Sequence, residues 1–279
     1  MKRILIPTDF SNNSWNATRY ALDLFKEETC TFFLLNTYTP AIANSRFMAS
    51  TINGGQIDGV LDISENGLKN VVKRIEETCL YKNHSFKTIS SFSLLVDEIK
   101  DTVERKQIDL IVMGTKGATG LKKVTMGSNT GDVITKVKCP LLAVPENAVY
   151  SKPKEIAFPM DFYLGYDVKV LDVLIELALL NKAALRILHV SKKGEELSEE
   201  QSKNKEFLED YLMDVEHSFH FVSGTKLEVA VQCFVESRSI DMIAMVAKNL
   251  NYFQRILFRP SVEQISYHTE IPFLVLHER

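Results

Sequence analysis

A glycine-spaced segment in the middle of the chain has the composition of a phosphate-binding loop. It reads GTKGATGLKKVTMGSNT from Gly114 to Thr130, between an apolar run and a helical pattern. Gly114 and Gly117 allow a positive φ and a close approach of the backbone to a ligand. Where the segment enters its helix, free amides, the positive end of the helix dipole and two hydroxyls favour a phosphate. The residues expected there are Gly127, Ser128, Asn129 and Thr130.

A second polar group follows the first apolar run of the chain, at Pro7, Thr8 and Asp9. The Asp9 carboxylate could accept hydrogen bonds from a ribose or an adenine group, or it could cap the turn that follows it. The commonest nucleotide fingerprints are absent, since the chain has no GxxxxGK[ST] loop and no GxGxxG after this first strand. The two polar groups therefore indicate a nucleotide site of another kind.

The elements that must position these residues occur twice. KRILIPTDF from Lys2 and KEIAFPMDF from Lys154 share five of nine residues, and 108–146 aligns without a gap to 240–278 with eight of 39 pairs identical. The offset is 152 residues at the front and 132 at the back, so the first copy carries 20 additional residues between these blocks. Self-similarity of this kind predicts two copies of one unit. The predicted domains are residues 1–147 and 148–279.

Strand-like and helix-like patterns alternate within each copy. Arg3 to Pro7 is almost wholly apolar, which is typical of a strand buried on both faces of a parallel sheet. A helix is expected at Ser64–Cys79, where apolar residues recur at three- and four-residue spacing. Strict alternation predicts an α/β fold with a parallel sheet and helices on both faces in each copy. Strands are expected at Arg3–Pro7, Thr31–Thr37, Phe86–Ser90, Ile108–Met113, Pro140–Val144, Ile156–Pro159, Ala184–Val190, Phe219–Val222, Asp241–Val246 and Phe273–Leu276.

Composition excludes several classes of protein. The net charge of −3 gives no basic field for nucleic acid or anionic lipid, so neither is an expected partner. The 45% hydrophobic and 25% charged residues are those of an ordinary globular protein. The four cysteines are scattered, which disfavours a zinc site or a disulfide framework. With neither a targeting nor a membrane-spanning segment in the sequence, we expect a cytoplasmic protein.

The glycine spacing resembles a known family. Gly114-x2-Gly117-x9-Gly127-Ser128 fits the G-2x-G-9x-G-[S/T] nucleotide signature of the universal stress proteins. ILIPTDFS near the N-terminus and KCPLLAVP from Lys138 are similar to that family's first and last strands. The resemblance covers essentially the whole chain as two tandem domains. It implies a Rossmann-like, five-stranded α/β fold in each domain and bound ATP, with Mg²⁺ accompanying the nucleotide.

The resemblance also gives roles to individual residues. Pro7, Thr8 and Asp9 would meet the adenosine part of ATP. Thr37 would offer its backbone to adenine. The base and ribose side would be lined by Met113, Gly114 and Gly117, and the phosphates would be held by Gly127, Ser128, Asn129 and Thr130.

The second copy departs from this pattern. Val246 stands where the first copy has Gly114, and Pro260 stands where it has Ser128. Valine disfavours a positive φ, and proline removes an amide that could meet a phosphate. Asp161 retains the position of Asp9, but the glycines do not recur. We expect the second domain to lack this ATP site.

These observations favour a nucleotide-responsive stress regulator, in which ATP orders the loop and shifts the population of a surface seen by a partner. With no nucleophile and base in evident proximity, turnover would at most be slow hydrolysis. The alternatives are a true ATPase or phosphotransferase, for which Asp132 is the only nearby carboxylate, and a binding module without a nucleotide. In the family the last strands join two chains, so Pro140–Val144 and Pro272–Leu276 would pair across the domains as an intramolecular pseudo-dimer, and a homodimer is a further possibility.

Overall fold

The computed structural model describes residues 1–39, 55–79, 83–115, 128–247 and 271–278 of the 279-residue chain. Ten β-strands in these ranges form a single sheet. The strands of the N-terminal half are β1 (Lys2–Pro7), β2 (Cys30–Tyr38), β3 (His84–Phe92), β4 (Leu110–Gly114) and β5 (Leu141–Val144). The strands of the C-terminal half are β6 (Glu155–Pro159), β7 (Ala184–Ser191), β8 (His217–Ser223), β9 (Met242–Val246) and β10 (Phe273–Leu276).

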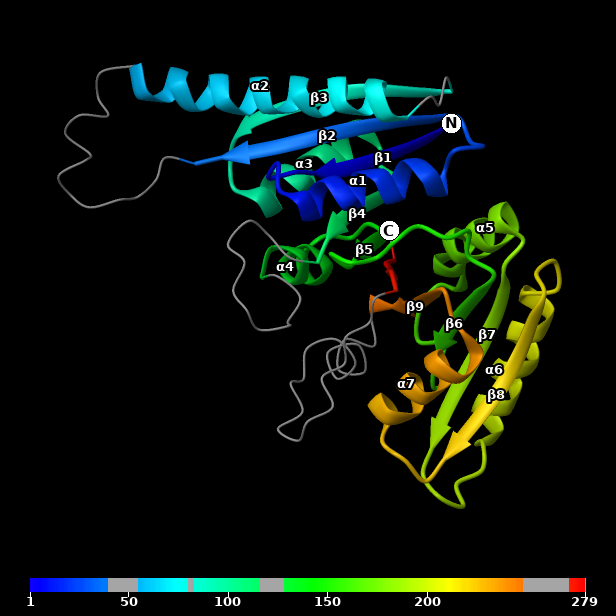
Figure 1. The fold of residues 1–279 in the computed structure, drawn as a ribbon. Coiled ribbons are helices and arrows are strands. Elements are labelled where there is room, and N and C mark those ends of the chain that lie inside the picture. The colour runs from blue at the N-terminus through cyan, green and yellow to red at the C-terminus, as the bar shows by residue number, and fades with distance from the viewer. Residues whose placement is uncertain (40–54, 80–82, 116–127, 248–270, 279) are drawn as a thin grey trace.

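The strand order is β3-β2-β1-β4-β5-β10-β9-β6-β7-β8. Every neighbouring pair is parallel except β5 and β10, which pair antiparallel with Leu142 opposite Leu274. Figure 1 shows the two halves meeting at these short strands, with the C-terminus in the middle of the molecule. Two tandem Rossmann-like α/β units, each with five parallel strands, therefore share one sheet. The predicted pairing of the last strands is confirmed.

Helices cover both faces of the sheet. The seven α-helices in the described ranges are α1 (Asn12–Leu24), α2 (Gly55–Thr78), α3 (Leu95–Lys106), α4 (Ser128–Lys136), α5 (Asp172–Asn181), α6 (Glu199–Tyr211) and α7 (Leu227–Arg238). A short 3₁₀-helix (Val168–Leu171) precedes α5. Residues of α1, α2, α5 and α6 share one core cluster, and residues of α3, α4 and α7 share the other. No helix within these ranges combines the length and the apolarity needed to cross a bilayer.

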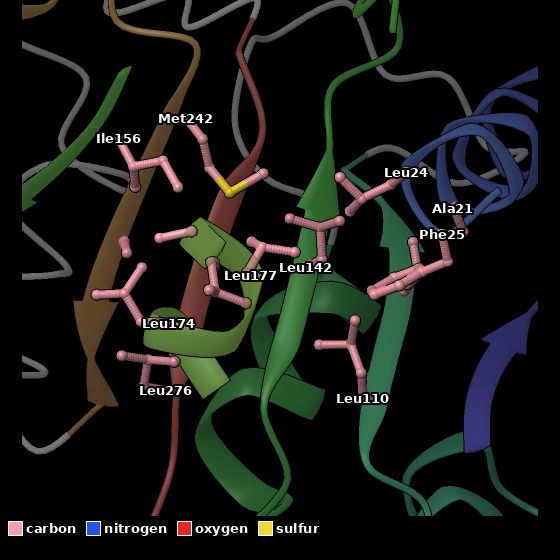
Figure 2. Close-up of a cluster of buried hydrophobic side chains, with 14 of the residues drawn as sticks. Ala21, Leu24, Phe25, Leu110, Leu142, Ile156, Leu174, Leu177, Met242 and Leu276 are labelled. Atoms are coloured by element: carbon pink, nitrogen blue, oxygen red, sulfur yellow. The ribbon is translucent and has the colours of Figure 1, made fainter. Parts of the chain in front are cut away.

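Successive side chains along a strand point to opposite faces of the sheet and so contribute to both core clusters. Ile4 and Ile6 join the cluster beneath α1, whereas Leu5 joins the cluster on the other face. All three are fully buried, as expected for a strand covered on both sides. Each cluster continues from one half into the other, and Figure 2 shows side chains from both halves, among them Leu142 and Leu276.

Local backbone features repeat at the two offsets seen in the sequence. Phe10 and Phe162 both have a left-handed backbone, with φ of 63° and 60°. Gln107 and Ser239 end α3 and α7 in the same conformation, each with φ of 51°. A non-glycine residue adopts this conformation uncommonly, so its recurrence at matched positions is a structural counterpart of the sequence repeat.

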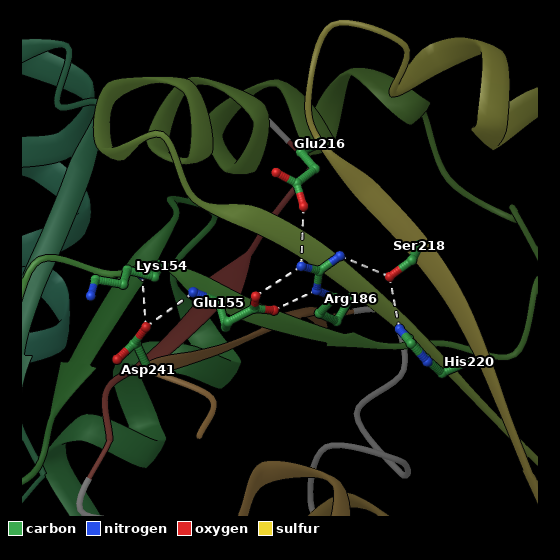
Figure 3. A network of polar contacts seen from close by, with 7 residues as sticks. All are labelled: Lys154, Glu155, Arg186, Glu216, Ser218, His220 and Asp241. Carbon is green, nitrogen blue, oxygen red and sulfur yellow. Dashed lines mark hydrogen bonds and ion pairs between the residues drawn. The ribbon is translucent and has the colours of Figure 1, made fainter. Parts of the chain in front are cut away.

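The repeated Ile-Asp pair has the same task in each half. The carboxylate of Asp109 accepts the backbone N–H of Arg3 at 2.8 Å. The carboxylate of Asp241 accepts the N–H groups of Lys154 and Glu155 at 2.7 and 3.0 Å, as Figure 3 shows. In both halves the aspartate before the fourth strand therefore holds the start of the first strand.

The 20 additional residues of the first copy all lie between its second and third strands. The chain has 45 residues between β2 and β3 but 25 between β7 and β8. Part of the difference is helical, since α2 has 24 residues and α6 has 13. The predicted start of this helix at Ser64 was wrong by nine residues, because α2 begins at Gly55.

Candidate functional site

The candidate site lies where the order of the strands reverses. The chain adds β2 and β3 on one side of β1 and then places β4 and β5 on the other side. Ligands of open α/β sheets bind beyond the carboxyl ends of the strands at such a point. Pro7 ends β1 opposite Leu35 of β2, and Gly114 ends β4 opposite Val144 of β5. The structure therefore brings Pro7, Thr8, Asp9, Thr37 and Gly114 to one edge of the sheet.

Thr8 is fixed at this edge by hydrogen bonds from three sides. Its N–H donates to the Leu35 carbonyl at 2.8 Å, and its carbonyl accepts from the Asn36 side chain at 2.7 Å. Its hydroxyl lies 3.0 Å from that of Ser14, and the side chain is buried. The Thr8 backbone is thus set by the protein itself before any ligand is considered.

Asp9 caps the turn that follows β1. Its Oδ1 accepts the N–H of Ser11 at 3.1 Å, and the residue is exposed. Asp161 does the same for Tyr163 at 3.1 Å in the C-terminal half. The capping interpretation therefore holds in both copies and accounts for the aspartate wherever the turn occurs. A contact between Asp9 and a ligand stays a prediction.

Gly114 is required by a close approach of another side chain rather than by its own backbone angle. A Cβ atom at this position would lie 2.6 to 2.8 Å from the side-chain atoms of Asn13, which is buried beneath the end of β4. Gly114 does not use the positive φ that glycine allows, since among the described glycines only Gly194 and Gly224 have one. The need for glycine is steric, and it comes from the first turn of α1.

Helix α4 begins directly against the end of β4. The Thr130 hydroxyl is buried and donates to the Gly114 carbonyl at 2.8 Å, while Asn129 is exposed. Ser128 is the first helical residue, so the amides of this turn have no partner within the helix. Gly117, Gly127 and the lysines between them lie outside the described residues. The Thr130 bond therefore fixes a helix N-terminus beside the candidate site.

Two further predicted residues differ in what they can offer. The Met113 side chain is 6% exposed and packs in the core cluster of α3 and α4, so a contact with a ligand would have to come from its backbone. Thr37 is half-buried near the end of β2, opposite Ser91 of β3. It lies at the correct edge of the sheet for the adenine contact that the family resemblance implies.

Asp132, the carboxylate named for an enzymatic alternative, lies on the outer surface of α4. Its Oδ1 accepts a hydrogen bond from the Lys136 ammonium at 2.8 Å, and 47% of its side chain is exposed. This is an i,i+4 ion pair of the kind common on helices. The described geometry gives Asp132 a partner on its own helix.

The matching edge of the C-terminal half is filled by aromatic side chains. His189 takes the place of Asn36, with its Nδ1 3.2 Å from the Met160 carbonyl. Its ring stacks on Phe162 at 5.0 Å between centroids, and Phe162 lies 6.1 Å from Phe221. Phe162 is fully buried, whereas Phe10 at the same position of the first half is 38% exposed. The two edges therefore share a backbone frame and differ in what occupies it.

Sequence reasoning missed three residues that shape the candidate edge. Asn13, Ser14 and Asn36 are all buried and contact Gly114 or Thr8. Polar residues inside an apolar strand or on the inner side of a helix are uncommon unless they are hydrogen-bonded, and Asn36 at the end of the LLN run is such a signal. The contact between Asn13 and Gly114 has no counterpart in local spacing.

Comparison with known proteins agrees with the repeated fold. The model of the universal stress protein family matches residues 1–145. A universal stress protein of Methanocaldococcus jannaschii is 34% identical over 158 residues, which cover 55% of this chain and 84% of that protein. A universal stress protein structure from Archaeoglobus fulgidus superposes with a TM-score of 0.71 at 19% identity, over 99% of this chain and 98% of that one.

A second full-length structure has the same fold. It is a putative universal stress protein from Pseudomonas aeruginosa, with a TM-score of 0.57 at 14% identity over 99% of this chain and 93% of that one. At such identities the structural likeness concerns the fold alone. The family model covers more than half of the chain, and the M. jannaschii relative is matched over most of its length. The chain belongs to the universal stress protein family.

Proposed function

We propose that the N-terminal half binds ATP at the carboxyl ends of β1, β2 and β4 and that the chain acts as a nucleotide-responsive stress regulator. The observation that carries this proposal is the hydrogen bond from Thr130 to the Gly114 carbonyl. It holds the N-terminus of α4 at the point where the strand order reverses. Unpaired amides at a helix N-terminus are a favourable environment for a phosphate.

The described residues fit the two ends of a nucleotide. Exposed Asp9 and the half-buried backbone of Thr37 lie at the adenosine end in this proposal, and Gly114 adds no side chain between them. The first turn of α4 lies at the phosphate end, with Ser128 and Asn129. Bound ATP would order the segment from Gly114 to Gly127, of which 116–127 lie outside the described residues, and Mg²⁺ would accompany its phosphates. No step of chemistry is required of the protein.

The antiparallel contact between β5 and β10 supports a second part of the proposal. We place the domain boundary after residue 147, so that 1–147 and 148–279 form a pseudo-dimer within one chain. Leu142 and Leu274 face each other at its centre and are 0% and 1% exposed. An aromatic stack at the matching edge of the second domain, built on Phe162 and His189, favours a single ATP per chain.

Gly117→Val is expected to abolish ATP binding while leaving the fold intact. Valine removes the conformational freedom that glycine gives this position and places branched methyl groups beside the proposed base and ribose side of the nucleotide. The matched control is Asn249→Val, which introduces the same side chain at the equivalent position of the second domain. Calorimetric titration of the full chain with ATP, with Mg²⁺ and with EDTA, measures both variants against the native protein. Circular dichroism checks that each is folded.

The native protein is expected to release an adenine nucleotide on denaturation, or to bind added Mg·ATP at a stoichiometry of one. Failure to find or to bind any adenine nucleotide would refute the proposal. Equal losses in both variants would mean that the second domain carries a working site. Rapid formation of ADP, abolished by Asp132→Asn, would instead identify an ATPase.

A further inference from the structure

A cavity of about 900 Å³ lies between the two halves, on the face covered by α1 and α5. Its floor includes Leu142 of β5 and Leu274 of β10. The end of α1 contributes Phe25, and α5 contributes Leu177 at the equivalent position. Figure 2 shows Leu142 between the side chains of these two helices. The cavity therefore lies across the line where the two halves meet, away from the proposed nucleotide site.

Along the β5–β10 contact, the cavity lies toward the end where Pro140 precedes β5 and His277 follows β10. At the other end of this contact, the segment that joins the halves occupies the matching position. The Asn16 side chain donates to the carbonyls of Pro145, Glu146 and Ala148 at 2.9 to 3.3 Å. The Tyr150 ring, from the same segment, packs edge-on against Tyr20 with 5.2 Å between centroids. The protein itself thus shows what fills this position when it is filled, namely an extended backbone and one aromatic ring.

The same offsets relate the filled position to the cavity. An offset of 152 takes Tyr20 to Asp172, and an offset of 132 takes Pro145 to His277, and both of these residues line the cavity. A carboxylate therefore replaces the phenol against which Tyr150 packs. In the second half, the cavity therefore corresponds to the position that the joining segment fills in the first half, but its lining residues differ.

The lining combines apolar side chains with more acidic than basic residues. Six carboxylates and three lysines line the cavity, and acids still predominate when the amino group of Met1 is counted with the lysines. One of the lysines, Lys2, is paired with Glu176 of α5 across the space between the halves. At one end the Asp167 N–H donates to Glu278 at 2.9 Å, which places two carboxylate residues together. This arrangement favours a ligand with a positive charge.

His277 is next to this acidic end. Its Nε2 is buried and has no hydrogen-bond partner within the described part of the chain. Burial lowers the pKa of the ring to about 4, so the imidazole is neutral near pH 7. A buried ring nitrogen without a partner is costly, and a ligand that donates a hydrogen bond to it would remove that cost.

We propose that the cavity binds an arylalkylammonium ion, with the ammonium between His277, Glu278 and Asp167 and the aromatic body over Leu142 and Leu274. The volume is within the range of sites for small organic ligands. The ring takes the place that Tyr150 takes on the other side. The ammonium contacts the carboxylates and donates a hydrogen bond to Nε2, which can accept it when the neutral imidazole carries its proton on Nδ1. The site is independent of the nucleotide proposal.

Three probes that share a phenylalkyl skeleton and differ in their terminal group test which charge the cavity prefers. The full chain is titrated by calorimetry with 4-phenylbutylammonium, 4-phenylbutanol and 4-phenylbutyrate at low and high salt. The ammonium is expected to bind at least about tenfold more tightly than the carboxylate, with the alcohol between them, and salt is expected to reduce the difference. Equal or tighter binding of the carboxylate, or no binding of the ammonium, would overturn the proposal.

Two variants on α5 test the location. Val173 lines the cavity, and Val173→Trp is expected to fill it and abolish binding of the ammonium. Leu179 lies on the same helix, is 50% exposed and is not part of the lining, so Leu179→Trp should bind normally. Melting curves of both variants confirm that they are folded. Normal binding by Val173→Trp, or equal loss in both variants, would place the ligand elsewhere.

A third variant tests the head group. His277→Phe keeps an aromatic ring in the wall and removes both ring nitrogens. It is expected to weaken binding of the ammonium about tenfold and to leave that of the alcohol almost unchanged, because a hydrogen bond to a charged group is stronger than one to a neutral group. Unchanged binding of the ammonium by this variant would contradict the assigned role of His277.

Discussion

Leu274→Asp is expected to lower the melting temperature of the chain by about 10 °C or more, because it places a carboxylate in the middle of the sheet. Leu274 is 1% exposed and lies between Leu142 of β5 and Ala244 of β10's parallel neighbour, β9. A buried, unpaired carboxylate costs several kcal/mol. Strand β10 pairs with β5 on one side and with β9 on the other, so the charge would disturb both pairings. Differential scanning calorimetry of the full chain measures the change.

The matched control for this substitution is Met213→Asp. Met213 is 74% exposed, so the same new charge meets water and should change the free energy of unfolding by no more than about 0.5 kcal/mol. Leu274→Met, which nearly conserves volume, should cost less than about 1.5 kcal/mol. A native-like melting temperature for Leu274→Asp would contradict both the burial of Leu274 and the central position of β10.

The strands and the α/β alternation could be predicted because the hydrophobic patterns that indicate them are local in the sequence. Runs such as Arg3 to Pro7 are almost wholly apolar, which is the pattern of a strand with helices on both faces, and the structure confirms it in β1, where Ile4 to Pro7 are buried. The repeat then required the second half to follow the first. The antiparallel contact of β5 and β10 needed more, because nothing in the alternation of strands and helices says which edges of two sheets will meet. The family resemblance supplied that pairing.

The position of the candidate site could be predicted from the sequence, but the contacts that hold its residues in place could not. The sequence indicated the ends of β1 and β4, and the structure brings Thr8, Asp9 and Gly114 to one edge. The sequence left open whether Asp9 caps a turn or meets a ligand, and it gave no sign that Asn36 holds the Thr8 carbonyl. These are contacts of polar side chains with particular backbone atoms, and residue spacing alone does not determine them.

The clearest case is Gly114, whose need for glycine comes from a residue about 100 positions away. Gly114→Ala is expected to destabilise the protein by about 2 kcal/mol, because its methyl group would lie 2.6 Å from the Asn13 side chain. Asn13 is 5% exposed and cannot move into solvent without disturbing α1. Asn13→Ala removes all three atoms that the methyl group would meet. The double variant should therefore recover much of the loss, with a coupling energy above about 1 kcal/mol.

Urea unfolding of the two single variants and the double variant measures this coupling. Gly59→Ala is the control: Gly59 lies in α2 with nothing within 4 Å of a new Cβ, so alanine should be neutral or stabilise by up to about 1 kcal/mol. The repeat supports this expectation. In the second half, Gly165 stands at the position equivalent to Asn13 and Val246 at the position equivalent to Gly114, so the large and the small residue of the pair are exchanged. Strictly additive effects would show that the contact is not what requires glycine. Loss of ATP binding by Gly114→Ala without any loss of stability would transfer that requirement to the ligand.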